Sequence, residues 1–281
     1  MSQGFLLFAH DNEKINYGAL AVWCAKRIHR WLDRPVSLVA DAVTIRKIRA
    51  SGLDLDVFDR VLTNSSETTQ VKRYKDELLT FHNLDRSNAY DLSPYDETII
   101  IDTDIIVQST SLNRLWNSNH DMVFCRHTRS VFGHSHPDLE YVSTYGIDFF
   151  WATEFYFRKG EEAKVFFETC KWIRDNYGWF ARVYAFDPNL MRNDFVWSIA
   201  VHQLGGKDHS NWAAQMPWPL FFTTNWGYVE ELSDDSVVLS HWIDTAKDTF
   251  DVCRVNSKDV HVMNKQSLQT FVLKELGLTN D

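Results

Sequence analysis

Three short apolar segments, each followed by an acidic residue, most constrain how this chain can fold. They are residues 4–9, 36–40 and 98–101, and the acids that follow them are Asp11, Asp41 and Asp102. Unbroken apolar runs of this length are typical of strands buried on both faces of a parallel sheet. The sequence therefore predicts an α/β fold, in which ligands bind at the carboxyl ends of the strands.

Helical periodicity separates these runs, and this alternation is typical of βαβ units. The expected helices cover residues 17–32, 44–51, 72–82, 161–177, 193–204 and 267–276. Further strands are expected at residues 58–62, 121–125, 149–157 and 237–240. Because no repeat, linker or low-complexity segment interrupts the pattern, we expect residues 1–281 to form a single domain.

The composition narrows the classes of function. A net charge of −9 argues against a sequence-independent nucleic-acid binder, which usually has a basic balance. The 4 cysteines form no C-x-x-C pair, which excludes a zinc ribbon and is typical of a reducing compartment. The sequence shows no signal peptide and no apolar run of about 18 residues. We therefore expect a cytoplasmic protein without a membrane span, and nothing in the sequence indicates a protein partner.

The most specific local pattern is TIIIDTDIIV at residues 98–107, where Asp102 and Asp104 interrupt an apolar strand. Burial of a carboxylate is costly unless it is paired or bound to a metal. Residues i and i+2 of a strand point to the same face, so both carboxylates are expected to converge on one cation. Oxygen ligands suit Mg²⁺ or Mn²⁺, and such ions usually bind phosphates as well. The alternative is a turn with two solvated aspartates.

The order and spacing of these segments resemble those of nucleotide-sugar-dependent glycosyltransferases of the A-type (GT-A) fold. The glycogenin-like, retaining family 8 enzymes are the most similar, and some phage-encoded enzymes of this type look alike. The segments that carry the resemblance are FAHDN (8–12), YGALAVWCAKRIHRWL (17–32), VSLVAD (36–41), AYDLSPYDETIIIDTDIIV (89–107) and DVHVMNK (259–265). The resemblance implies a Rossmann-like mixed, mainly parallel sheet flanked by helices. Residues 1–110 would be the nucleotide-binding half, and residues 111–281 the acceptor-side half with a C-terminal metal and diphosphate element.

The resemblance also implies roles for individual residues. The nucleotide would be bound by Phe8, Ala9, His10, Asp11, Tyr17, Asp41, Lys75 and Lys265. The metal would be bound by Asp102, Asp104 and His261, with His241 as the alternative third ligand. The family usually has a glycine and a longer spacing between this histidine and the lysine, whereas Val-Met-Asn lies between His261 and Lys265 here.

Two further acids are candidates for contacts with the sugars, next to Asp104 as the central catalytic acid. Glu154 lies in the aromatic segment WATEFYFRKG, and Asp194 opens a predicted helix in the segment RND. The alternatives are a strand edge for Glu154 and, for Asp194, an ordinary helix N-terminal acid that the helix dipole favours.

The resemblance implies a Mn²⁺- or Mg²⁺-dependent transferase that moves a hexosyl or pentosyl unit from a UDP-sugar to a hydroxyl acceptor with retention. The acceptor is a carbohydrate or another hydroxyl compound, a hydroxymethylated DNA base among them. Aromatic candidates for stacking on it are Trp179, Trp212, Trp218 and Trp226. The alternatives are a haloacid-dehalogenase-like phosphatase, a nucleotidyltransferase, or a carbohydrate-binding module with a platform at residues 218–228.

Overall fold

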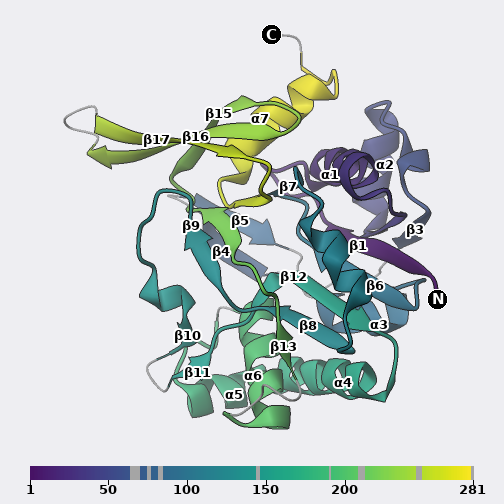
Figure 1. Cartoon of the computed structure of the whole chain (residues 1–281), viewed down its shortest axis with the longest axis vertical. Helices are drawn as coiled ribbons and strands as arrows, with labels where there is room; N and C mark the ends of the chain where they lie inside the picture. Colours follow the sequence, from purple (N-terminus) through teal and green to yellow (C-terminus); the bar gives the residue numbers. More distant parts are fainter. Residues whose placement is uncertain are drawn as a thin grey trace.

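A mixed seven-stranded sheet forms the centre of the described part of the chain (Figure 1). The computed structural model describes residues 1–63, 70–74, 77–81, 85–143, 146–189, 191–207, 213–244 and 249–279. Across the sheet the order is β13 (Ala214–Gln215), β8 (Met122–Cys125), β12 (Trp151–Arg158), β6 (Glu97–Ile101), β1 (Gln3–Ala9), β2 (Val36–Ala40) and β3 (Arg60–Thr63). Strands β6, β1, β2 and β3 are parallel, whereas β12 is antiparallel to both β6 and β8. The prediction of an α/β fold with a mixed, mainly parallel sheet is confirmed.

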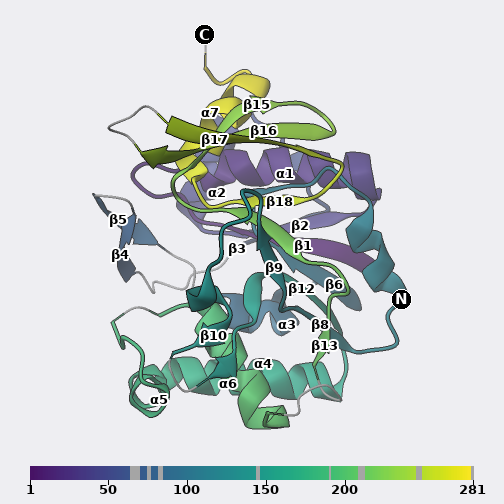
Figure 2. The same ribbon diagram turned by 60° about the vertical axis from the view of Figure 1, so that its left-hand side comes forward.

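Helices pack against this sheet from two sides, as Figure 2 shows, with α1 and α2 above the strands and α4, α5 and α6 below them. Their bounds are α1 (Tyr17–Leu32), α2 (Ala42–Ala50), α4 (Glu161–Asp175), α5 (Tyr177–Tyr184) and α6 (Asn193–Gly205). Helix α1 contacts β1 and β2, and α6 contacts β12. Every residue of β2 and β6 is buried, as the unbroken apolar runs predict.

A second sheet, built from short strands, continues from the carboxyl end of β6. Its order is β7 (Ile105–Ile106), β18 (Val260–Val262), β14 (Leu220–Thr223) and β9 (Thr128–Ser130). The expectation of one strand through residues 98–107 is therefore wrong. The chain leaves the central sheet after Ile101, turns through Thr103 and enters the second sheet at Ile105. The turn therefore places the apolar residues before it in the central sheet and the apolar residues after it in the second sheet.

A third, antiparallel sheet projects from the body of the molecule as the hairpin on the left of Figure 1. Its strands are β15 (Gly227–Leu232), β16 (Ser236–Asp244) and β17 (Thr249–Asn256). The C-terminal helix α7 (Lys265–Glu275) packs against β15 and α1. This contact joins the C-terminal segment to the first helix of the chain.

Two predicted helices differ from the observed elements. The helix expected at residues 72–82 is wrong, because the described residues there form the antiparallel strands β4 (Gln70–Tyr74) and β5 (Glu77–Phe81). Helix propensity is a weak preference that strand pairing overrides. The helix expected at residues 161–177 ends at Asp175, and α5 follows after Asn176.

The remaining short elements include α3 (Ala89–Leu92), β10 (Tyr141–Val142) and β11 (Ile147–Asp148). Among the described residues, no helix combines the length and the apolar character that crossing a bilayer demands.

Candidate functional site

The turn between β6 and β7 brings the two acids of the D-x-D pattern together. The backbone N–H of Asp102 donates to the carbonyl of Thr153 on β12, at 3.0 Å. The carbonyl of Asp102 accepts from the N–H of Ile105 at 3.3 Å, which closes the turn. The carbonyl of Asp104 accepts from the N–H of Val262 at 3.0 Å. The acids converge because the backbone turns between two sheets, not because a strand alternates its side chains.

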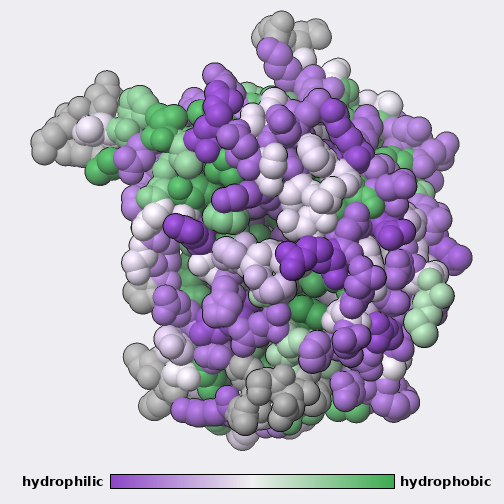
Figure 3. Space-filling view, viewed as in Figure 1, coloured by the Kyte–Doolittle hydropathy of each residue, from purple (hydrophilic) through white to green (hydrophobic). Residues whose placement is uncertain are grey.

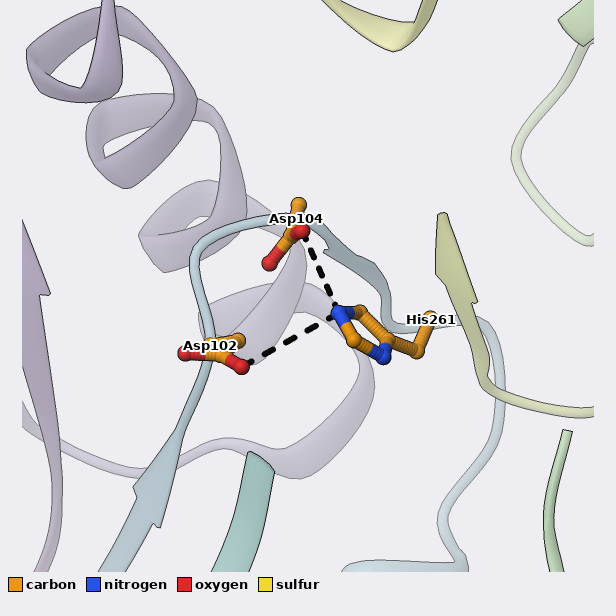
Figure 4. Close-up of side chains that lie close together, drawn as sticks. All are labelled: Asp102, Asp104 and His261. Carbon is orange, nitrogen blue, oxygen red and sulfur yellow. Dashed lines mark hydrogen bonds and ion pairs between the residues drawn. The ribbon is translucent and has the colours of Figure 1, made fainter. Parts of the chain in front are cut away.

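His261 completes the cluster from the second sheet. It lies on β18, where it pairs with Ile105 in antiparallel register. Its Nε2 atom is 3.2 Å from Oδ2 of Asp104 and 3.9 Å from Oδ2 of Asp102, as Figure 4 shows. His241, the alternative third ligand, lies instead on β16, where its ring contacts Phe132.

The donor set of this cluster fits a divalent metal ion. One ligand atom of each residue, taken from Asp102, Asp104 and His261, lies within 4.8 Å of the others. Asp104 is 2% exposed, while the side chain of Asp102 is 22% exposed and opens toward solvent. Two carboxylates and one imidazole suit Mn²⁺ better than Mg²⁺, because Mg²⁺ prefers oxygen ligands alone.

Lys265 adds a positive charge to this cluster from the first turn of α7. Asn264 caps that helix by accepting from the N–H of Ser267, which orients the helix start. The Nζ atom of Lys265 is 2.6 Å from Oδ2 of Asp104. Burial alone would raise the pKa of Asp104, but Lys265 and His261 outweigh it and hold the pKa of this carboxyl below its ordinary value. Asp104 is therefore ionised in its buried position.

Arg86 is a site residue that the sequence reasoning missed. Its guanidinium is buried, donates to the carbonyl of Ala152 and pairs with Oδ1 of Asp102. It also lies 5.9 Å from the ring centroid of Phe8. Burial lowers the pKa of Arg86 to about 10, partly offset by Asp194 and Asp104, so the group stays charged near neutral pH. No local pattern around Arg86 distinguishes a buried arginine from a surface one.

Asp194 lies near the start of α6 and lines the same cavity as Asp102, Asp104 and His261. Its carboxylate accepts from the N–H of Ala152 at 2.8 Å and pairs with Arg192 at 2.9 Å. Burial raises the pKa of Asp194, but Arg192 and the hydrogen bond from Ala152 outweigh this effect and lower it overall. The sequence reasoning also missed Arg192 as the partner that keeps this acid ionised.

These residues surround one cavity of about 780 Å³, a size within the usual range for small-molecule sites. The sequence-predicted residues on its wall are Phe8, His10, Tyr17, Asp102, Asp104, Asp194, Trp226, His261 and Lys265. The cavity thus brings together the ends of β1 and β6, the start of α6 and the C-terminal element, which are far apart in the sequence.

Other predicted residues lie outside this lining. Ala9 is fully buried in β1, and the carboxylate of Asp11 accepts from the N–H of Gly18 at 2.9 Å. The carboxylate of Asp41 caps α2 by accepting from the N–H of Thr44 at 2.6 Å. Glu154 is buried on β12, and desolvation, followed by the charge of Asp259, raises its pKa to about 8. Lys75 and Trp212 lie outside the described residues.

No family model matches this chain, and no curated protein matches it. Among solved structures, it is similar to the galactosyltransferase LgtC in complex with donor and acceptor sugar analogs, with a TM-score of 0.45, 13% identity, and coverage of 75% of this chain and 72% of that one. It is also similar to mouse xyloside xylosyltransferase 1 in its apo form, with a TM-score of 0.45, 12% identity, and coverage of 93% and 97%. The glycosyltransferase GlyE of Streptococcus pneumoniae TIGR4 gives a TM-score of 0.42 and 12% identity, with coverage of 77% and 46%.

Proposed function

We propose that this chain is a metal-dependent glycosyltransferase of the GT-A type, which transfers a hexosyl or pentosyl unit from a UDP-sugar to a hydroxyl acceptor with retention. The observation that carries the proposal is the convergence of Asp102, Asp104 and His261 with Lys265 in one cavity. The carboxylates and the imidazole would hold Mn²⁺, and the ammonium would add charge for a diphosphate. The resemblance of the sequence segments supports a nucleotide sugar as the donor.

The cavity offers distinct surroundings for the two ends of such a donor. Phe8, His10 and Tyr17 lie at the carboxyl end of β1 and the start of α1, where α/β sheets bind nucleotides. Asp194, held ionised by Arg192, lines the same cavity and would accept hydrogen bonds from hydroxyls of the donor sugar. In this arrangement residues 1–110 supply most of the nucleotide contacts. Glu154 is 2% exposed on β12 and does not line the cavity.

The transfer step breaks the bond between the anomeric carbon and the diphosphate oxygen, and the electron pair leaves with the diphosphate. The new bond forms between the anomeric carbon and the acceptor oxygen, whose proton moves to a donor phosphate oxygen. A bound divalent ion would supply Lewis-acid stabilisation of the leaving group. Lys265 would neutralise charge on the same diphosphate, and Arg86 would hold Asp102 in place. This front-face route requires no covalent nucleophile and gives retention.

The phosphatase alternative would use Asp102 as the nucleophile. Its Oδ1 atom is paired with the buried guanidinium of Arg86, which lowers the nucleophilicity of the carboxylate. A glycosyltransferase is therefore the better account of this geometry. Hydrolysis of p-nitrophenyl phosphate by the wild type would favour the phosphatase instead.

The proposal is tested by comparing wild type with Asp104→Asn, which keeps the size of the buried side chain. UDP with Mn²⁺ should stabilise the wild type by about 2.7 kcal/mol at 100 times its Kd. Asp104→Asn should lose this stabilisation, together with UDP-sugar hydrolysis, and EDTA should abolish both in the wild type. Asp91→Asn is the matched control, because Asp91 is exposed and pairs with Lys171 at the surface, away from the cavity. If Asp104→Asn still binds UDP with Mn²⁺, the assignment of the metal site is wrong. If the product has the inverted anomer, the proposal of retention is wrong.

A further inference from the structure

The C-terminal helix α7 contacts the loop in front of α1 through the side chain of Gln269. Its Oε1 atom accepts from the N–H of Asn16 at 2.5 Å, and its Nε2 atom donates to the carbonyl of Lys14 at 3.2 Å. One amide group therefore satisfies a donor and an acceptor of the same loop. Gln269 and Asn16 are 253 residues apart in the sequence, so no local pattern indicates this contact.

The loop that Gln269 contacts leads directly into the wall of the cavity. Asn16 caps α1, because its Oδ1 atom accepts from the N–H of Ala19 at 2.8 Å. Tyr17, the first residue of α1, follows Asn16 and lines the cavity. The hydrogen bond from Asn16 to Gln269 therefore fixes the helix start that carries Tyr17.

The same face of α7 carries the cation of the candidate metal site. Lys265 and Gln269 lie four residues apart in this helix, so their side chains are neighbours on its surface. The Nζ atom of Lys265 is 2.6 Å from Oδ2 of Asp104, and Lys265 lines the cavity. One turn of α7 thus links the cation next to Asp104 to the loop in front of Tyr17.

Two further side-chain contacts hold α7 at other places. Oγ of Ser267 accepts from the N–H of Val229 on β15, and Oε2 of Glu275 accepts from Nε1 of Trp23 on α1, both at 2.8 Å. Glu275 is the last residue of α7 and lies about 15 Å from Lys265 along the helix. Hydrophilic side chains cover most of the surface over α1 and α7, as Figure 3 shows. Because water competes for polar groups near this surface, the loss of one contact should leave the fold intact.

We propose that Gln269 is a positioning residue that couples the binding of a nucleoside beside Tyr17 to the binding of a metal-bound diphosphate beside Lys265. The assignment rests on the proposed function, because that function gives the cavity a ligand with both parts. It deepens that function by naming the contact that makes the two parts bind together. Gln269 does not line the cavity, so it acts through the loop and through α7 and not by touching the ligand.

The coupling follows from the properties of a ligand with two linked parts. Once one part is bound, the other binds as if at a high concentration, provided that both sites keep the right separation. Gln269 joins the two elements that carry these sites. Without this contact each part still binds at its own site, but the whole ligand must first order the two elements relative to each other, which costs affinity.

The test compares wild type with Gln269→Met, which keeps the length and the helix propensity of the side chain and removes both hydrogen bonds. Three ligands are titrated: uridine alone, followed by NMR, and pyrophosphate with Mn²⁺ and UDP with Mn²⁺, followed by calorimetry. Gln269→Met should bind UDP with Mn²⁺ about tenfold more weakly than wild type, a usual size for coupling between sites. It should bind uridine and Mn²⁺–pyrophosphate within about twofold of wild type, because each site alone is intact.

The matched control is Glu275→Met, which removes a contact between α7 and α1 of the same kind at the far end of the helix. It should bind all three ligands as wild type does. A second measurement needs no variant. Mn²⁺ with pyrophosphate should slow hydrogen exchange of the Asn16 amide in the wild type, although this ligand binds beside Lys265, because coupling between sites is reciprocal.

The role of Gln269 is overturned if Gln269→Met binds UDP with Mn²⁺ like wild type, or if it weakens uridine or Mn²⁺–pyrophosphate as much as UDP. It is also overturned if Glu275→Met has the same effect, or if exchange of the Asn16 amide does not change. Failure of the wild type to bind UDP with Mn²⁺ would overturn the proposed function itself. Binding by the wild type together with any of the other outcomes overturns only the role of Gln269.

Discussion

Acids follow three strands of the central sheet, but those after β1 and β2 make different contacts from those after β6. The carboxylates of Asp11 and Asp41 accept from backbone N–H groups in the first turns of α1 and α2. Asp11 also pairs with the exposed Lys47 at 3.4 Å, whereas the cations that face Asp102 and Asp104, Arg86 and Lys265 respectively, are more buried. All four acids follow similar apolar strands, so the strand alone does not decide their role.

The difference comes from the element that follows each acid. A helix that follows the acid offers free N–H groups in its first turn, which satisfy the carboxylate. After Asp104 the chain enters strand β7, which offers no such groups to the side chain. The carboxylate oxygens of Asp102 and Asp104 are therefore not used by backbone N–H groups of a following helix and can bind a ligand. A strand-end acid is a candidate metal ligand where the next element is not a helix.

The largest expected effect comes from removing the cation that holds Asp102. Arg86→Met should lower the free energy of unfolding by about 3 kcal/mol, because it leaves the partner carboxylate unpaired. It should also weaken UDP–Mn²⁺ binding by about 10–100-fold, as loss of a ligand-orienting contact usually does. Urea unfolding and a titration of Mn²⁺ with UDP measure the two effects.

The exposed Arg182 of α5 supplies the control, since Arg182→Met changes the same charge on the surface. Unchanged Mn²⁺ affinity in Arg86→Met would show that Asp102 needs no positioning. The two kinds of strand-end acid would then not differ in their need for a cation.

Much of the fold is predictable from the sequence because its signals are local. The observed α1 spans Tyr17–Leu32 as predicted, with Pro35 after it, and β2 spans the predicted Val36–Ala40. The helix expected at residues 72–82 fails because its Lys, Glu and Leu residues favour a helix only weakly against strand pairing. The sequence favours a strand over the alternative turn at Asp102–Asp104, because the apolar residues on both sides of these acids give no sign that they belong to two sheets.

The candidate site was predictable only in part for a similar reason. The D-x-D acids stand out because charge inside an apolar run is rare, but His261 is 157 residues from Asp104 and entered through the resemblance alone. Arg86 and Arg192 are ordinary arginines in the sequence, and only tertiary packing places them against Asp102 and Asp194. Residues that orient a ligand acid leave no local pattern.

Glu154 sharpens the comparison, because it is a buried acid that pairs with Ile101, next to Asp102, and no cation among the described residues lowers its pKa. Its pKa is raised from 4.5 to about 8 in the fold, so folding favours the neutral form. The stability that neutral Glu154 contributes is present below pH 4.5 and is lost as the pH rises toward 8. Glu154→Gln should match wild type at pH 5 and exceed it by about 2–4 kcal/mol at pH 9.

Urea unfolding at the two pH values measures this difference, with Glu162→Gln on the exposed side of α4 as control. An equal offset between Glu154→Gln and wild type at pH 5 and pH 9 would mean that Glu154 is ionised in the fold. The ionised carboxylate of Glu154 would then need a stabilising cation or polar contact, as the carboxylates of Asp102 and Asp104 have.

The smallest expected effect concerns Asp41, which the resemblance assigns to the nucleotide and which the structure places at the start of α2. Asp41→Ala should lower the free energy of unfolding by about 1 kcal/mol, because the N–H of Thr44 loses its acceptor. Asp41→Asn should stay close to wild type, since asparagine caps helices equally well. Urea unfolding and UDP titration of both variants measure the outcome. If both variants unfold like wild type and bind UDP more weakly, Asp41 contacts the nucleotide. An acid that caps a helix after a strand could then still bind a ligand.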